Sequence, residues 1–118
     1  MSAASEQDIY TTMRDWKWSA GEKAIARKTF EQALEEELRQ TVAAFKDRSA
    51  RVKDASELWK IEDWLAERRK DIDQKYDYRY SVLGLVFERL VREARVKKDD
   101  LRGLSADKLE MIRRVSEF

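Results

Sequence analysis

The side chains that enzymes most often use for proton transfer and metal binding are missing from this sequence. Its 118 residues include no His and no Cys, which removes the usual general base, the thiolate nucleophile and any disulfide. The acidic residues are scattered, and a pair such as Asp71 and Asp73 cannot act together because residues i and i+2 point apart on a helix. The three glycines are too far apart for a phosphate-binding loop. We therefore expect a protein that is not an enzyme and that has no metal, cofactor or small-molecule substrate.

One helical surface does combine residue types that recognise other proteins. The segment from Ser56 to Arg79 contains no Gly and no Pro, which predicts a helix. On that helix Trp59 lies roughly 125° from the centre of the apolar stripe, at 100° per residue. Asp63 lies on one side of Trp59, and Glu62 and Arg69 lie on the other. Two interpretations are open: Trp59 packs against a neighbouring helix among ordinary solvated charges, or the four residues form a protein-binding patch, because Trp and Arg dominate binding hot spots.

Around this helix the sequence predicts an all-α fold. There is no Pro in the chain, so long helices with short connections are expected. Ser19 and Glu22 form a capping box at the start of a helix that runs from Ala20 to about Val52. Its apolar positions, Phe30, Leu34, Leu38, Phe45 and Val52, fall on one side. The central helix follows, capped by Asp54 or Ser56 and ending near Tyr76, with an apolar stripe formed by Leu58, Ile61, Leu65, Ile72 and Tyr76.

The last third of the chain predicts a smaller helical unit. Alternating tyrosines at 76, 78 and 80 indicate a kink or a brief break. The segment SVLGLVFERLV is the most apolar of the chain and predicts a buried helix. A strand over 82–87 is the alternative, although no partner strand is visible elsewhere. A short helical turn at 97–101 and a final helix capped by Ser105 complete the unit.

Length and charge define how these helices are organised. A helix of more than thirty residues spans about 50 Å, which a domain of this size cannot cover by itself, so we expect a homodimer. We predict a flexible N-terminal arm at 1–17, a long two-helix stalk at 18–76 and a small helical head at 77–118. A net charge of +1 argues against a nucleic-acid partner. No apolar run approaches a transmembrane segment, and the N-terminus lacks a signal-peptide core, so we expect a cytoplasmic protein.

The segment LWKIEDWLAERRKDIDQKYDYRYSV, at 58–82, resembles the fluorescence recovery protein family of cyanobacteria. The resemblance covers roughly residues 18 to 118. The matching positions are Leu58, Trp59, Lys60, Asp63, Leu65, Arg69, Ile72, Asp73, Lys75, Tyr76, Asp77, Arg79, Ser81 and Val82, together with Trp18, Ser19 and Glu22 upstream and Val86, Phe87, Leu90, Val91, Ala106, Asp107 and Lys108 downstream.

The resemblance implies an all-helical homodimer that regulates photoprotection without being an enzyme. Family members bind the photoactivated, red form of the orange carotenoid protein and speed its return to the orange form, which ends non-photochemical quenching of phycobilisome fluorescence. They carry no carotenoid of their own, and in a cyanobacterium such a protein would act in the cytoplasm near the thylakoid surface. The family's functional Trp, Asp and Arg fall on Trp59, Asp63 and Arg69. The resemblance favours Arg69 as the partner contact, Asp63 as its steering charge, and Trp59 as a residue of the dimer seam or the partner site.

Several positions depart from the family pattern. Glu62 replaces a His beside the patch and reverses the local charge, and it is kept among the partner-binding candidates. In the head, Leu85 replaces an implicated Phe and Met111 an implicated Lys. An alternative function is therefore a homologous helical-dimer interaction protein, from a bacterium without the orange carotenoid protein and with a different partner.

Overall fold

The computed structural model describes residues 6–117 and contains only helices within that range. They are α1 (Glu6–Arg14), α2 (Ala20–Ala50), α3 (Ala55–Lys75), α4 (Leu83–Arg92), the 3-10 turn η1 (Lys98–Leu101) and α5 (Ala106–Ser116). The described residues form no strand, apart from one isolated bridge between Arg102 and Leu104. The all-α prediction is therefore confirmed, and the strand alternative for 82–87 is excluded by α4.

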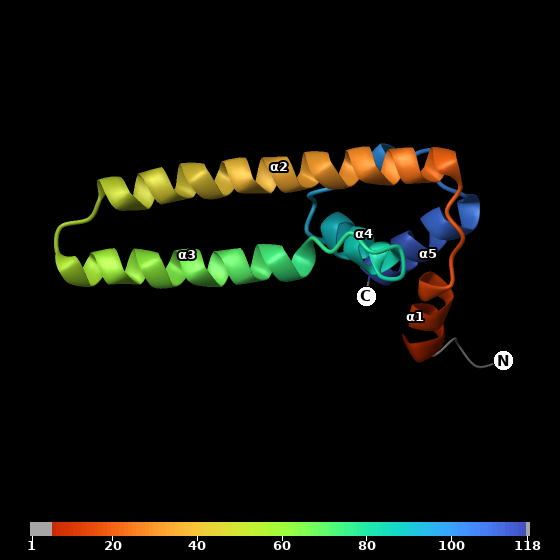
Figure 1. Ribbon diagram of the computed structural model, residues 1–118, viewed down its shortest axis with the longest axis horizontal. Helices are drawn as coiled ribbons and strands as arrows, with labels where there is room; N and C mark the ends of the chain where they lie inside the picture. Colours follow the sequence, from red (N-terminus) through yellow and green to blue (C-terminus); the bar gives the residue numbers. More distant parts are fainter. Residues whose placement is uncertain (1–5, 118) are drawn as a thin grey trace.

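The helices α2 and α3 lie antiparallel and form a long hairpin (Figure 1). The predicted capping box begins α2: Ser19 Oγ accepts from the amide of Glu22 at 3.1 Å, and the amide of Ser19 donates to Glu22 Oε1 at 3.0 Å. Asp54, and not Ser56, is the N-cap of α3, where its carboxylate accepts from the amide of Glu57. Across the hairpin, the guanidinium of Arg48 stacks 4.4 Å from the ring of Trp64.

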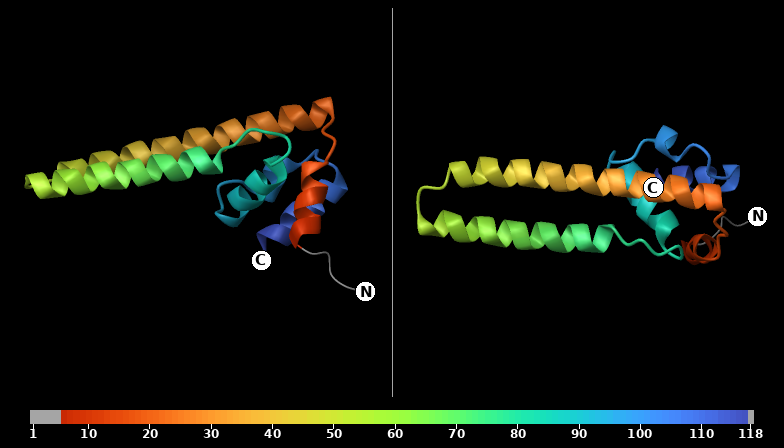
Figure 2. Two further views of the ribbon diagram at one scale, coloured as in Figure 1. Left: turned by 60° about the horizontal axis from the view of Figure 1, so that its bottom comes forward. Right: turned by 45° about the horizontal axis from the view of Figure 1, so that its top comes forward.

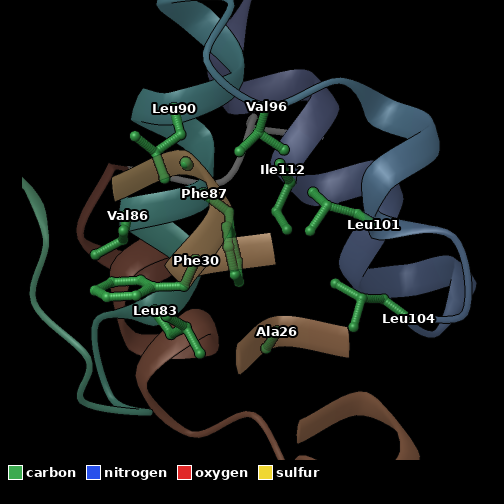
Figure 3. Packing of buried hydrophobic residues seen from close by; sticks show 11 residues of the cluster. Ala26, Phe30, Leu83, Val86, Phe87, Leu90, Val96, Leu101, Leu104 and Ile112 are labelled. Carbon is green, nitrogen blue, oxygen red and sulfur yellow. The ribbon is translucent and has the colours of Figure 1, made fainter. Parts of the chain in front are cut away.

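The remaining helices gather near the end of the hairpin where α2 begins, and we call this part the helical cluster: α1, α4, η1, α5 and the first third of α2 (Figure 2). Its centre is α4, whose Leu83, Phe87 and Leu90 are fully buried. These side chains pack against residues of α2, η1, α5 and the loops between them (Figure 3): Ala26, Phe30, Val96, Leu101, Leu104 and Ile112. The α4 segment therefore forms the apolar core, as its composition predicts.

The predicted break after the central helix is also present. The helix α3 ends at Lys75, and residues 76–79 connect it to the turn before α4 without helical structure. Tyr76 and Tyr78 both pack edge-on against Phe30, with ring centroids 5.5 and 4.9 Å apart. The alternating tyrosines thus fix the connection onto α2.

Part of the predicted N-terminal arm is helical in the structure. Residues 1–5 lie outside the described residues, but α1 occupies 6–14. Its Met13 is fully buried, against α4. The boundaries at 17 and 76 stay predictions.

The half of the hairpin that extends beyond the cluster leaves its apolar side chains open to solvent. Leu38, Val42 and Phe45 of α2 and Leu58 and Leu65 of α3 are between 39% and 52% exposed. The molecule measures 59 × 32 × 21 Å, and its radius of gyration of 17.5 Å exceeds the value of about 13.5 Å expected for a compact chain of this length. The α2 stripe therefore packs within the chain at Phe30 but not at Leu38 or Phe45, because two helices alone cannot enclose it. Within residues 6–117, no helix combines the length and apolar character that a membrane crossing needs.

Candidate partner-binding surface

The four residues that the sequence singles out all lie on α3 and are all exposed. Trp59 is 58% exposed, so it is not buried against another helix of the same chain. Trp59 lies close to the start of α3, at the turn, which is the hairpin end farthest from α5 (Figure 1). Arg69 lies about 15 Å farther along the helix, at 1.5 Å per residue. The four residues thus extend along one helix and do not converge on a point.

Arg69 differs sharply from the arginine beside it. The Arg69 side chain is 85% exposed, and its Nε lies 3.8 Å from Asp73 Oδ2, a carboxylate that is itself exposed. Arg68 is only 28% exposed, and its guanidinium nitrogen Nη2 lies 3.1 Å from Glu37 Oε2 on α2. Arg68 therefore joins the two helices, whereas the guanidinium of Arg69 extends into solvent and can bind another molecule.

A shallow groove between α2 and α3 brings two of the four residues together with apolar side chains. Its lining includes Glu62 and Arg69, which lie on the same face of α3 about two turns apart. It also includes the apolar residues Leu38, Leu65 and Ile72. Charges of both signs therefore border an apolar floor, the arrangement of a polar rim around a hydrophobic centre that protein interfaces share. Trp59 and Asp63 lie outside the lining of this groove.

The structure does not place the two head candidates with the α3 residues. Leu85 lies in the first turn of α4 and Met111 on α5, and both are half-buried. Met111 lines a second groove, whose opposite wall includes Thr12 of α1 and Trp16. The candidate residues thus belong to two separate surfaces, one on the hairpin and one on the cluster.

The sequence interpretation missed a buried cluster of charges where α2, α3 and α4 meet. At its centre Glu37, which is fully buried, accepts hydrogen bonds from Lys75 Nζ at 2.8 Å and from the hydroxyl of Tyr76 at 2.7 Å. Arg95 Nε lies 2.9 Å from Glu37 Oε1. Arg68 approaches from α3, so three cations surround one carboxylate, and two further acids, Glu93 and Asp71, lie within 2.8 and 3.5 Å of Lys75. We call this set the Glu37 cluster.

The local electrostatics favour the charged forms of the two outer acids of this cluster, Glu93 and Asp71. Burial raises the pKa of Glu93, but its hydrogen bonds with Lys75 and Arg89 lower the pKa by more than burial raises it. The pKa of Glu93 therefore lies below its ordinary value. The hydrogen bond from Arg89 likewise lowers the pKa of Asp71. Burial, and next the hydrogen bond to the carboxylate of Glu37, raise the pKa of the Tyr76 hydroxyl. Tyr76 therefore stays a neutral donor to Glu37.

A second buried ion pair joins the start of α2 to α5. Lys108 Nζ lies 3.1 and 3.0 Å from the two carboxylate oxygens of Glu22 and donates to the carbonyl of Lys17 at 2.6 Å. Glu22 also accepts from the amides of Ser19 and Ser105. Burial raises the pKa of Glu22, but these amides and Lys108 together lower it to about 2. A partial signal for both buried sites was present in the sequence, since Glu22, Lys75, Tyr76 and Lys108 are among the positions of the resemblance, but Glu37 is not.

Nothing in residues 6–117 gathers three or more acidic side chains in a way that could hold a metal ion. The surfaces that contain the candidate residues are the exposed side of α3, the apolar hairpin surface and the groove beside Met111. All three are suited to contacts with another protein.

Comparisons with known proteins give a consistent result. A family model described as photoprotection regulator fluorescence recovery protein matches residues 18–116. A fluorescence recovery protein from Synechocystis sp. is 34% identical over 101 residues, which are 86% of this chain and 93% of that protein. Among solved structures, the fluorescence recovery protein of Fremyella diplosiphon superimposes with a TM-score of 0.84 at 33% identity, and that of Synechocystis with 0.83 at 33%. Each match covers 86% of this chain and all of the solved chain.

Proposed function

The chain belongs to the fluorescence recovery protein family, and on that basis we propose that it binds the photoactivated orange carotenoid protein and accelerates its return from the red to the orange form. The family is one of photoprotection regulators. In this role the chain would end the quenching of phycobilisome fluorescence. The observation that carries the proposal is the exposed Arg69 at a groove on α3, a large charged side chain with no partner buried in the chain.

The proposed partner-binding residues are Arg69, Asp63, Trp59 and Glu62. Arg69 supplies a planar guanidinium that can bind a partner carboxylate through two hydrogen bonds. Asp63 lies six residues before it on α3 and steers or positions the partner by its charge. Glu62 borders the same groove as Arg69, so its carboxylate favours a basic group on the partner opposite the groove. In the cluster, Leu85 and Met111 are proposed as secondary contacts.

The proposed activity is a shift of populations and not a chemical step. A protein that speeds the relaxation of a photoproduct must bind an intermediate on the return path better than it binds the photoproduct itself. Exposed side chains on a rigid hairpin can provide such binding, because α3 holds them in place without rearrangement of the chain. No cofactor is required for this role.

We also propose that the chain is a homodimer whose seam includes the exposed apolar residues of the hairpin. Leu38, Val42, Phe45, Leu58 and Leu65 are between 39% and 52% exposed and lie on both hairpin helices. Apolar surface that recurs over adjacent elements marks a protein contact, and a second copy of the same hairpin offers a matching surface. Trp59, with 58% of its surface exposed, lies on the same hairpin and can contribute to this seam. Under this proposal residues 18–76 form the stalk, 77–118 the head and 1–17 the arm.

The experiment that tests the function is the dark decay of photoactivated orange carotenoid protein with and without this chain. Substitution Arg69→Leu should abolish the acceleration, while helicity and dimerisation stay as in the unaltered protein, because Arg69 has no buried partner in the chain. A matched control is Arg102→Leu, which removes an arginine that is 82% exposed on the cluster. The control should accelerate recovery like the unaltered chain.

Two results would contradict the proposal. If Arg69→Leu accelerates recovery normally, Arg69 is not the partner contact. If the unaltered, folded chain leaves the decay unchanged beside a working family member, the fold is shared but the partner is a different protein.

A further inference from the structure

The helix α1 is an element that the family match does not include. The family model begins at residue 18, whereas α1 covers Glu6–Arg14 and packs on α4. In Figure 2 it lies beside α4 and α5, at the end of the hairpin where α2 begins. It places the side chain of Met13 in a fully buried position. The helix α1 is therefore a part of the cluster that lies outside the family match.

The contact between α1 and α4 depends on a glycine. A Cβ atom at Gly84 would lie 2.6 Å from Cζ3 of Trp16 and 3.3 Å from Sδ of Met13. Both residues thus rest directly on the α4 backbone. Glycine is unfavourable inside a helix, and at this position the close approach of Met13 and Trp16 accounts for it. The surface that they cover is apolar, since it adjoins the fully buried Leu83.

The same segment borders the groove that contains Met111. Thr12 and Trp16 form one wall, and Lys108, Met111 and Arg114 of α5 form the other. The residue next to Gly84 in α4 is Leu85, which is half-buried. The segment 12–16 therefore occupies the space between the α4 surface and the groove beside Met111.

We propose that α1 is an internal cover for this cluster surface, and that a protein partner reaches the α4 surface around Gly84 only when α1 moves away. The proposal rests on the proposed function, because it concerns the access of that same partner to the α4 surface that adjoins Leu85. The surface fits a partner that presents a long apolar side chain in the place of Met13.

The attachment of α1 is weak enough to be reversible. A helix of nine residues is not stable by itself. Among the side chains of α1 whose burial the structure describes, Met13 is fully buried and Ile9 is half-buried, while Thr11, Thr12 and Arg14 are exposed. Elements with few buried contacts open at the lowest free energies. The partner then binds only the open fraction of molecules, so its apparent dissociation constant is raised by the inverse of that fraction.

The test is a full-length chain with Met13→Asp, compared with Thr11→Asp. Both variants add a carboxylate to α1, but Met13 is buried and Thr11 is exposed. Met13→Asp should release α1, because a carboxylate cannot stay charged in that position without a partner. Tryptic cleavage after Arg14 reports the release, and circular dichroism checks the remaining helices. The second measurement is the dissociation constant for the photoactivated orange carotenoid protein.

If α1 is a cover that is closed in nine molecules out of ten, Met13→Asp should bind about tenfold more tightly, while Thr11→Asp changes neither cleavage nor binding. A second variant, Gly84→Ala, displaces Met13 and Trp16 from the other side and should also speed the cleavage. The proposal is overturned if the cleavage rises while binding stays equal or weakens, or if neither variant releases α1. If the unaltered chain accelerates recovery but Met13→Asp does not bind the partner more tightly, the proposed function stands and only the proposal that α1 is a cover is overturned. If neither the unaltered chain nor the variant binds, both proposals fail.

Discussion

At the scale of single residues, two adjacent residues of the same type can differ completely in burial. Arg68 and Arg69 are adjacent, yet only Arg68 reaches the Glu37 cluster. Glu36 and Glu37 are adjacent as well, and Glu36 forms a surface ion pair with Arg39 while Glu37 is fully buried. A surface ion pair contributes little to stability, whereas a buried carboxylate among three cations is costly to remove. The same substitution should therefore have very different effects at the two positions.

Substitution Glu37→Gln should destabilise the protein by about 3–5 kcal/mol, because it leaves Lys75, Arg68 and Arg95 without their shared charge in a buried site. The matched control Glu36→Gln should change the free energy of unfolding by less than about 0.5 kcal/mol. Urea unfolding followed by circular dichroism measures both. A loss below about 1 kcal/mol for Glu37→Gln would show that water or side-chain motion replaces the missing charge.

The Glu37 cluster also marks the limit of sequence-based prediction at this scale. The exposure of Arg69 could be predicted, because helical periodicity places it away from the apolar stripe. For Trp59 periodicity left both packing against a helix and exposure open. The burial of Glu37 could not be predicted, because Glu37 lies in a run of three glutamates and its partners come from Lys75, Tyr76 and Arg95, far along the chain. Periodicity describes one helix and contains no information on which charge a distant segment brings to it.

At the scale of the elements, local signals predicted the helix boundaries well. The capping box at Ser19, the caps at Asp54 and Ser105 and the break after Lys75 all depend on residues a few positions apart, which is why the sequence could indicate them. The docking of α1 on Gly84 was not predicted, because an isolated glycine in an apolar helix does not identify the segment that rests on it. The contacts that hold the elements together join residues far apart in the sequence, as the Glu22–Lys108 pair between α2 and α5 illustrates.

The Glu22–Lys108 pair should make the stability depend on acid pH. The pKa of Glu22 is about 2 in the folded chain and about 4.5 ordinarily, so between these values the unfolded chain binds the proton more readily. The contribution of Glu22 is therefore complete above about pH 4.5 and is lost as the pH falls towards 2. Urea unfolding at pH 6 and pH 3 should show the stability gap between the unaltered chain and Glu22→Gln shrinking, by at most about 1.4 kcal/mol per pH unit. An equal gap at both values would mean that Glu22 does not favour the charged form.

At the scale of the whole molecule, the elongated shape is the feature that a single chain does not explain. A compact fold encloses its apolar side chains, but the hairpin leaves five of them between 39% and 52% exposed over its outer half. The helix lengths in the sequence predict this surplus of surface, because a helix of more than thirty residues extends past a core of this size. The helical cluster has an apolar core and the buried Glu22–Lys108 pair to hold it together. The outer half of the hairpin has neither, so it is the part that the proposed second copy would cover.

The proposed dimer can be tested at Val42, near the middle of the exposed stripe. Val42→Asp should shift the protein from dimer to monomer at micromolar concentration, because a carboxylate would be buried in the seam without a partner. Within one chain Val42 is 52% exposed, so the helical content of the variant should not change. The control Ala24→Asp places the same charge at an exposed position of α2 beside the cluster and should stay dimeric. Sedimentation velocity distinguishes the two states. A Val42→Asp chain that remains dimeric would place the seam on another surface, and a monomeric one that still binds its partner through Arg69 would separate the partner surface from the seam.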